Sequence, residues 1–88
     1  MAVVTLRGPL RKLAGDRAQH PVAGGTIAEL LRELERCEPA LGGWILDERG
    51  ILRRHINVFV NGERALQDTP VGEDDHVDVL PAISGGAA

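Results

Sequence analysis

Residues 56–62 read Ile-Asn-Val-Phe-Val-Asn-Gly and combine the two strongest signals for β-structure in this chain. The first five residues alternate aliphatic side chains with Asn57 and Phe59, which is the period of a strand with one buried face. Asn61-Gly62 follows at once, and both central residues of a type I′ turn need a positive φ. The sequence therefore predicts a β-hairpin in which residues 63–65 return as a short strand.

Three further strands are predicted on the two sides of this hairpin. Alternating apolar residues indicate strands at 3–6 and 76–80, the first of which ends near Arg7. A shorter one at 18–22 contains Pro21, which favours the edge of a sheet. We expect the first two strands to form a hairpin with a long loop.

One helix is predicted between the second and third strands. Thr26-Ile27-Ala28-Glu29 is a capping box, in which the threonine hydroxyl accepts from the Glu29 N–H and the Glu29 carboxylate reaches back to Thr26. Apolar residues then form one stripe, and the helix ends by Pro39. A helical turn after residue 41 is expected to place Trp44 or Leu46 on the core. The order of elements predicts an α+β fold, a small mixed sheet with one main helix across one face.

Size and composition exclude several classes of protein. With 88 residues and no break in composition, the chain has room for one domain, which we assign to residues 1–81. A domain this small encloses a deep active site with difficulty, which disfavours an enzyme. A net charge of −3 disfavours nucleic acid as a partner, and no apolar run approaches the ~18 residues of a membrane span. The single cysteine, Cys37, favours a cytoplasmic protein.

The sequence offers no recognisable set of metal ligands. His20, His55 and His76 lie on three predicted strands or at their ends, with no carboxylate or cysteine at a metal spacing. We therefore expect surface histidines and no metal site. Cys37 lies three residues after Leu34 on the helical stripe, which favours a buried or half-buried apolar role over that of a nucleophile.

The end of the chain and the predicted hairpin together resemble one known family. Residues 80–86 read Leu-Pro-Ala-Ile-Ser-Gly-Gly, and residues 57–63 read Asn-Val-Phe-Val-Asn-Gly-Glu. With the lone capped helix, these stretches resemble the ubiquitin-like β-grasp fold and, within it, the MoaD/ThiS family of prokaryotic sulfur carrier proteins. The resemblance spans residues 4–86, and the run at 53–61 is most similar to the carrier of cysteine biosynthesis.

This resemblance implies a protein cosubstrate rather than an enzyme. In such carriers an activating enzyme adenylates the terminal glycine carboxylate, which becomes a thiocarboxylate that donates sulfur to an accepting synthase. Carried over here, Gly86 would bear the acyl group and Gly85 would precede it. The chain then needs no cofactor of its own, because ATP belongs to the activating enzyme. Glycine suits a tail that enters a narrow channel, since a Cβ would limit its approach.

The residues at the end of the chain leave several explanations open. We expect residues 82–88 to form a mobile tail. Ala87-Ala88 hold the Gly86 carbonyl in a peptide bond, and some relatives carry short extensions that a JAMM-type metalloprotease removes. Such a precursor is our first hypothesis. Residues added during cloning, or a tail that is no longer used, are the alternatives.

The resemblance leaves the destination of the sulfur open. Cysteine biosynthesis is the first hypothesis and molybdopterin the second, followed by thiamine and sulfur-containing secondary metabolites. Two functions of other classes also remain: a ubiquitin-like modifier conjugated through Gly86 to lysines of target proteins, and a non-catalytic β-grasp interaction module.

A surface for the activating enzyme is predicted on the sheet. If the aliphatic residues of strand 56–60 face the helix, Phe59 lies on the opposite face, and the same parity places Leu80 there. With Ile83 at the root of the tail, these residues form a candidate partner-binding surface. The alternative is that Phe59 packs beneath a loop.

Overall fold

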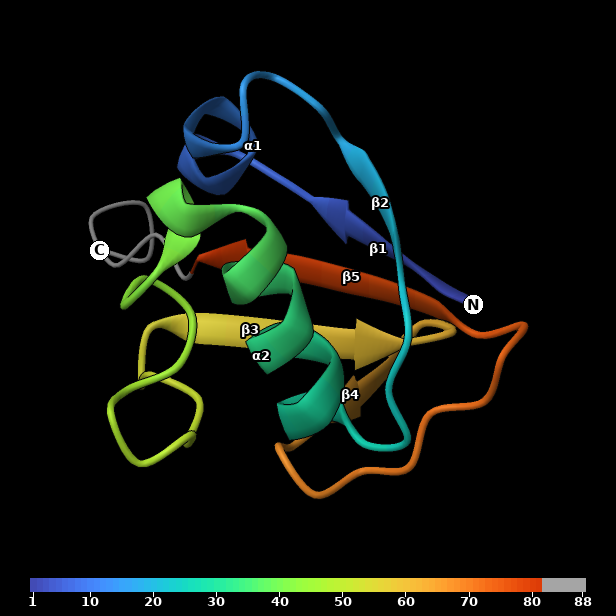
Figure 1. Cartoon of the computed structure of the whole chain (residues 1–88). Helices are drawn as coiled ribbons and strands as arrows, with labels where there is room; N and C mark the ends of the chain where they lie inside the picture. The colour runs from blue at the N-terminus through green and yellow to red at the C-terminus, as the bar shows by residue number, and fades with distance from the viewer. Residues whose placement is uncertain (82–88) are drawn as a thin grey trace, which may run out of the picture.

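The computed structural model describes residues 1–81, in which five strands form one mixed sheet. The strands are β1 (Ala2–Leu6), β2 (Gln19–Val22), β3 (Ile56–Val60), β4 (Glu63–Ala65) and β5 (His76–Pro81). The helices are α1 (Pro9–Leu13), α2 (Ile27–Cys37) and the short 3₁₀ helix η1 (Pro39–Leu41). Figure 1 shows α2 lying across one face of the sheet. The predicted α+β arrangement is therefore confirmed, and β3, β4 and the edge position of β2 lie where the sequence indicated.

The sheet has the strand order β2-β1-β5-β3-β4, with β1 and β5 side by side at its centre. These two strands run parallel, and the other neighbouring pairs are antiparallel. Leu6 is opposite Val79, and the Arg7 N–H donates to the Val79 carbonyl at 3.1 Å. The end of β1 therefore lies beside the end of β5, from which residue 82 continues.

Aliphatic side chains fill the space between α2 and the sheet. In the register Val4↔Val77 and Val58↔Val79, all four valines are buried. The apolar stripe of α2 packs on them. Its buried members are Ile27, Leu30, Leu31 and Leu34. With almost no aromatic residues, this aliphatic core holds the two layers together by burial of apolar surface.

The start of α2 is capped much as its sequence predicts. The Thr26 hydroxyl accepts from the Glu29 N–H at 3.3 Å. The Glu29 carboxylate bonds one residue earlier than predicted, accepting from the Gly25 N–H at 2.9 Å. The N–H groups of Ile27 and Ala28 donate to carbonyls of the loop before β5, at 3.0 and 2.8 Å. The N–H groups at the start of α2 are thus already hydrogen-bonded to the protein's own backbone.

The hairpin turn between β3 and β4 is confirmed and is tied to β5. Asn61 and Gly62 have φ of 51° and 88°, the left-handed values of a type I′ turn. The Asn61 side chain accepts from the His76 N–H and donates to the Asp75 carboxylate, both at 2.9 Å. The Gly72 N–H, and after it the Asn61 amide, hold the pKa of the Asp75 carboxyl below its usual range.

One local prediction needs correction, and an alternative that the sequence left open is decided. The long loop after β1 contains α1, which Pro9 begins and which buries Leu10 in the core. Of the two side chains expected to reach the core after residue 41, Leu46 does so and Trp44 is 50% exposed. The Glu35 carboxylate explains this choice, because it accepts from the N–H groups of Ile45 and Leu46 and fixes the loop with Ile45 and Leu46 inward.

Two adjacent glycines before α2 are predicted to differ sharply in their tolerance of alanine. A Cβ at Gly24 would lie 2.7 Å from both the N and Cα atoms of Leu30, whereas a Cβ at Gly25 would meet only the flexible Glu29 carboxylate, at 3.1 Å. Neither glycine has a positive φ. Gly24→Ala is therefore expected to lower the free energy of unfolding in urea by about 1–3 kcal/mol. Gly25→Ala is the matched control and should change it by less than about 0.5 kcal/mol. Equal effects would contradict the difference in space around the two glycines.

Candidate functional site

The predicted acyl site lies outside the described residues. Gly85, Gly86 and Ile83 all follow Pro81, the last residue that the structure places. What the structure describes is the surface around the point where the chain leaves β5. This surface has three parts. They are α1, the loop that precedes β3, and the face of the sheet opposite α2.

Phe59 and Leu80 lie together on the sheet face turned away from α2. In the β3–β5 register Phe59 is opposite Asp78 and Asn57 is opposite Leu80, so Phe59 and Leu80 are diagonal neighbours on one face. Both are half-buried. The parity predicted from the sequence is therefore observed. As a partner-binding surface, the pair remains a prediction.

Paired polar side chains flank this apolar pair. On one side an Arg7 guanidinium N–H donates to the Asp78 carboxylate at 3.1 Å. On the other side Arg64 donates to the Asn57 amide oxygen at 2.8 Å. An apolar centre with a polar rim is the usual anatomy of a protein interface. Sequence reasoning missed this rim, since only the pairing of β1 with β5 brings Arg7 to Asp78.

Further along the same face, β1 and β5 share a second polar contact. The Thr5 hydroxyl and the His76 Nε2 are 3.0 Å apart, and that nitrogen lies 3.7 Å from the Asp78 carboxylate. Thr5 is buried although it lies on the face without a helix. The side chains across β1 and β5 are thus held by one another, which gives the face a fixed shape.

Two predictions about reactive side chains are wrong. His20 is 4% exposed rather than on the surface, because its place on β2 turns it toward the core, where its Nε2 donates to the Arg17 carbonyl at 2.9 Å. Cys37 is exposed rather than buried, because α2 ends there and the chain turns into η1; its thiol donates to Glu33 at 3.5 Å. Across residues 1–81, no group of three or more His, Cys, Asp or Glu residues is arranged to hold a metal ion.

Comparison with protein families gives a match that covers almost the whole chain. The family described as the ThiS family matches residues 4–86. The chain belongs to the ThiS family. The match extends past Pro81 and ends on Gly86, the second glycine of the pair identified in the sequence.

Relatives of this ThiS-family chain include modifiers and sulfur carriers. Small archaeal modifier protein 1 of Haloferax volcanii is 33% identical over 79 residues, covering 88% of this chain and 91% of that protein. Sulfur carrier protein CysO of Mycobacterium tuberculosis is 28% identical over 83 residues, covering 88% and 89%. A chain in the crystal structure of the Amycolatopsis orientalis BexX/CysO complex superposes with a TM-score of 0.85 at 25% identity, covering 94% and 97%.

These relatives establish the fold family and the general class of the protein. The neighbours are ubiquitin-like β-grasp proteins, so the fold predicted from the resemblance is confirmed. They are small protein carriers rather than enzymes, and this chain belongs to a family of sulfur carriers and ubiquitin-like modifiers. In the part of the chain that the structure describes, no helix is both long and apolar enough to cross a bilayer.

Proposed function

We propose that this protein is a sulfur carrier that works through the carboxylate of Gly86. The observation that supports it most strongly is the family match, which runs through the β-grasp domain and ends on Gly86. The CysO relatives support the same class, since they align over 88% of this chain. In the sequence Ala87-Ala88 follow, so the proposal includes cleavage after Gly86, for which a JAMM-type metalloprotease is the expected catalyst.

The proposed chemistry uses the carrier as a substrate of its activating enzyme. The Gly86 carboxylate attacks the α-phosphorus of ATP and pyrophosphate leaves, which gives an acyl adenylate. Hydrosulfide supplied by the partner then attacks the acyl carbon, AMP leaves, and Gly86 bears a thiocarboxylate. In the accepting synthase the thiocarboxylate sulfur displaces a leaving group from the acceptor and forms a thioester. Water then hydrolyses the thioester, so that the sulfur stays on the acceptor and the Gly86 carboxylate is regenerated. Residues 1–81 supply the surface that the partner proteins bind. ATP is bound by the activating enzyme.

Cysteine biosynthesis is the proposed destination of the sulfur, and similarity to the CysO proteins supports it. Molybdopterin is second, followed by thiamine and sulfur-containing secondary metabolites. The partner that accepts the tail decides among them. Each alternative therefore predicts a different accepting synthase in a pull-down with the sulfur-loaded protein.

The intact mass of the untagged protein from its own organism, grown under sulfur limitation, tests the proposal. The expected species ends at Gly86 and has sulfur in place of one terminal oxygen. In the Cys37→Ser variant, which removes the only cysteine, treatment with a thiol-alkylating reagent should add one label to this species. A protein that always retains Ala87-Ala88 and an ordinary carboxylate would refute both processing and sulfur transport.

A second candidate function is that of a ubiquitin-like modifier, joined through Gly86 to lysines of target proteins. The 33% identity to small archaeal modifier protein 1 favours it. Isopeptide conjugates would survive boiling and thiol reductants and would be detected on an immunoblot of cell extract. If no conjugates are detected but the thiocarboxylate is present, only the sulfur carrier function is supported. If the protein is instead an interaction module, deletion of residues 85–88 should leave its binding and phenotype unchanged.

The face that bears Phe59 and Leu80 is the proposed docking surface for the activating enzyme. Truncation of a central interface aromatic commonly costs about 2 kcal/mol, so Phe59→Ala is expected to weaken binding of the activating enzyme about 30-fold. Arg32→Ala is the control, because Arg32 is exposed and lies on α2, which covers the opposite face of the sheet. Calorimetric titration measures both variants, with far-UV circular dichroism to verify folding. An unchanged dissociation constant for a folded Phe59→Ala would rule out this surface.

A further inference from the structure

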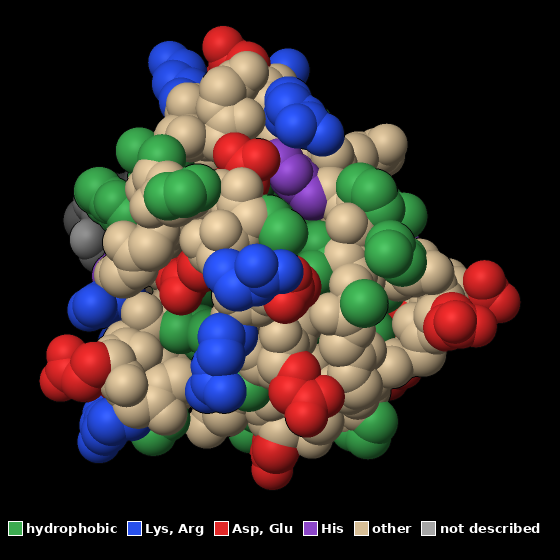
Figure 2. All heavy atoms as spheres, viewed as in Figure 1, with side chains coloured by type: hydrophobic (Ala, Val, Ile, Leu, Met, Phe, Trp, Pro, Cys, Tyr) green, Lys and Arg blue, Asp and Glu red, His purple; other side chains and the backbone are tan. Residues whose placement is uncertain are grey.

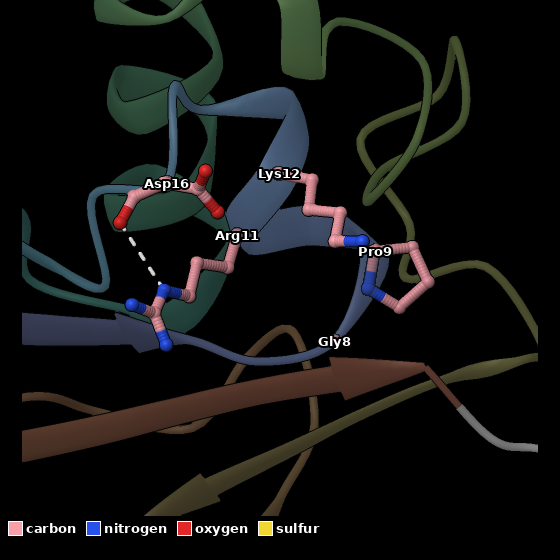
Figure 3. Close-up of a pocket in the computed structure, with 5 residues that line it drawn as sticks. All are labelled: Gly8, Pro9, Arg11, Lys12 and Asp16. Carbon is pink, nitrogen blue, oxygen red and sulfur yellow. Dashed lines mark hydrogen bonds between the residues drawn. The ribbon is translucent and has the colours of Figure 1, made fainter.

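An open groove with two basic side chains lies at α1. Its walls come from Gly8, Pro9, Arg11, Lys12 and Asp16, and its volume is about 620 Å³. Figure 3 shows the Arg11 guanidinium turned toward the backbone of Asp16 and the Lys12 side chain extended toward Pro9. Sequence patterns alone predict only a loop at this position. We call this hollow the α1 groove.

The position of the α1 groove is fixed relative to the end of β5. Leu10 anchors α1, since its side chain is 2% exposed in the core. Gly8 has φ of 62°, and a Cβ there would lie 3.9 Å from the ring of Pro81. The groove therefore adjoins the residue from which the tail continues. Gly86 is the fifth residue after Pro81, and five extended residues span at most about 18 Å.

The cations of the α1 groove have unused donors. The Arg11 Nε donates to the Asp16 carbonyl at 3.1 Å, a neutral acceptor. Among the described residues, Lys12 forms no ion pair or hydrogen bond, and the Asp16 carboxylate pairs with neither cation. By contrast, Arg7 pairs with Asp78. A partner carboxylate would therefore meet two cationic side chains that form no ion pair within residues 1–81.

The α1 groove also belongs to a basic segment of an acidic protein, in which Arg7 and Arg17 pair with Asp78 and Glu38 while Arg11 and Lys12 form no ion pair among the described residues. Residues 1–17 hold four of the ten Lys and Arg residues but one of the 13 acidic residues. Figure 2 shows basic side chains with acidic ones among them around α1, further basic ones at the lower left, and a group of acidic ones at the far right, where the chain enters β5. Charge separation of this kind orients an approaching partner before contact. It favours an acidic partner surface at the end of the molecule from which the tail continues.

We propose that the α1 groove docks an acidic peptide segment of the protein that acts on Gly86. The inference rests on the proposed function for the identity of that protein, while the recognition of carboxylates rests on Arg11 and Lys12. Because Gly86 lies within about 18 Å of Pro81, an enzyme that acts on it brings its surface over the elements beside Pro81. The α1 groove is distinct from the Phe59 and Leu80 face, and it sets which end of the carrier turns toward the partner.

Chemical-shift mapping with a defined acidic probe tests the inference without the activating enzyme. The ¹⁵N-labelled full chain is titrated with an N-acetylated, C-amidated octapeptide of Asp, Glu and one Leu. Shift changes are expected at Gly8 to Asp16. Raising NaCl from ~0.05 M to ~0.5 M should weaken binding about tenfold, because the groove is exposed to screening. Shifts spread evenly over the basic residues, shifts confined to the Phe59 face, or no shifts at the lower salt concentration would each overturn the proposal.

Matched charge reversals give the test its specificity. Arg11→Glu with Lys12→Glu is expected to weaken peptide binding at least about tenfold. Arg32→Glu with Arg54→Glu changes the net charge equally, at exposed positions away from the α1 groove, and should leave the groove shifts in place. The double variant Arg11→Gln with Lys12→Gln should weaken peptide binding by an intermediate amount. Because it removes the two charges without reversing them, it controls for disruption of α1 by the introduced glutamates. If both double Glu variants weaken peptide binding equally, the effect depends only on net charge, and the proposal is overturned.

The two hypotheses fail in different experiments. If peptide shifts map to the α1 groove but no thiocarboxylate forms in the cell, acidic docking stands and the proposed function fails. If the thiocarboxylate forms and the peptide produces no groove shifts, sulfur transport stands and the docking inference fails. With the purified activating enzyme, the Arg11 and Lys12 reversal is expected to lower the association rate more than it raises the dissociation rate.

Discussion

Replacement of Gly86 by valine is expected to reduce the sulfur-loaded protein below detection in sulfur-limited cells. A β-branched side chain restricts the backbone angles that glycine adopts freely and widens the tail where it must approach a nucleotide. Residues 1–81 do not include this position, so the circular dichroism spectrum and the thermal unfolding midpoint should match those of the parent protein. The readout is the intact mass of protein isolated from the cell.

Two companion variants locate the step that Gly86→Val blocks. Ala88→Val places the same side chain two residues further on and should load sulfur normally, which shows that valine in the tail is not itself harmful. Gly86→Val in a chain expressed as residues 1–86 removes the need for cleavage, so a persistent loss would assign the block to adenylation or sulfur transfer. Normal loading of Gly86→Val in both backgrounds would contradict an acyl site at this residue.

Leu31→Ala is expected to cause a large loss of stability. Leu31 is fully buried in the stripe by which α2 packs on the sheet. Leucine-to-alanine changes at such sites lower the free energy of unfolding by about 2–5 kcal/mol, through lost burial and the cavity left behind. Small domains have only about 5–15 kcal/mol in total. Urea unfolding followed by circular dichroism measures the change.

Leu66→Ala is the control for Leu31→Ala. Leu66 is 61% exposed, so the same change of side chain there should alter the free energy of unfolding by less than about 0.5 kcal/mol. A loss below about 1 kcal/mol for Leu31→Ala would mean that the core relaxes into the space, and that α2 is held chiefly by its cap and its backbone contacts to the loop before β5.

Short-range signals explain which elements were predictable from the sequence. The alternation of residues 56–60 and the Asn61-Gly62 turn each act within a few residues, and the structure contains both. The cap at Thr26 and the stripe of α2 are equally local. In each case the chemistry of neighbouring residues determines the backbone, so the prediction needed no knowledge of the rest of the fold.

The predictions that were wrong or left open depend on contacts between distant segments. Trp44 is exposed because Glu35, ten residues before Ile45, fixes the loop through backbone N–H groups. Cys37 continues the stripe in sequence, yet the helix ends before anything covers it. His20 is buried by the placement of β2 on the sheet. Propensity and periodicity contain no information about such partners.

The features of the candidate site also fall into two groups, those that local patterns predicted and those that depend on contacts between distant segments. Parity within β3 and β5 placed Phe59 and Leu80 on one face, as the register shows. The Arg7–Asp78 ion pair joins residues 71 apart, and the α1 groove needs Gly8 beside Pro81. Neither could be derived from local patterns. Gly85 and Gly86 were identified from the resemblance of the tail alone, and their role stays a prediction.

The parallel pairing of β1 with β5 has a consequence for how the chain folds during synthesis. β1 is made first, and its central neighbour follows every other strand of the sheet. Closing so long a loop is slow, and topologies dominated by distant contacts fold more slowly than local ones. Until β5 docks, the sheet lacks its middle strand, and the face that bears Phe59 and Leu80 does not exist. If an activating enzyme docks on this face, as proposed above, a nascent or truncated chain cannot bind it, and activation is restricted to molecules that have completed folding.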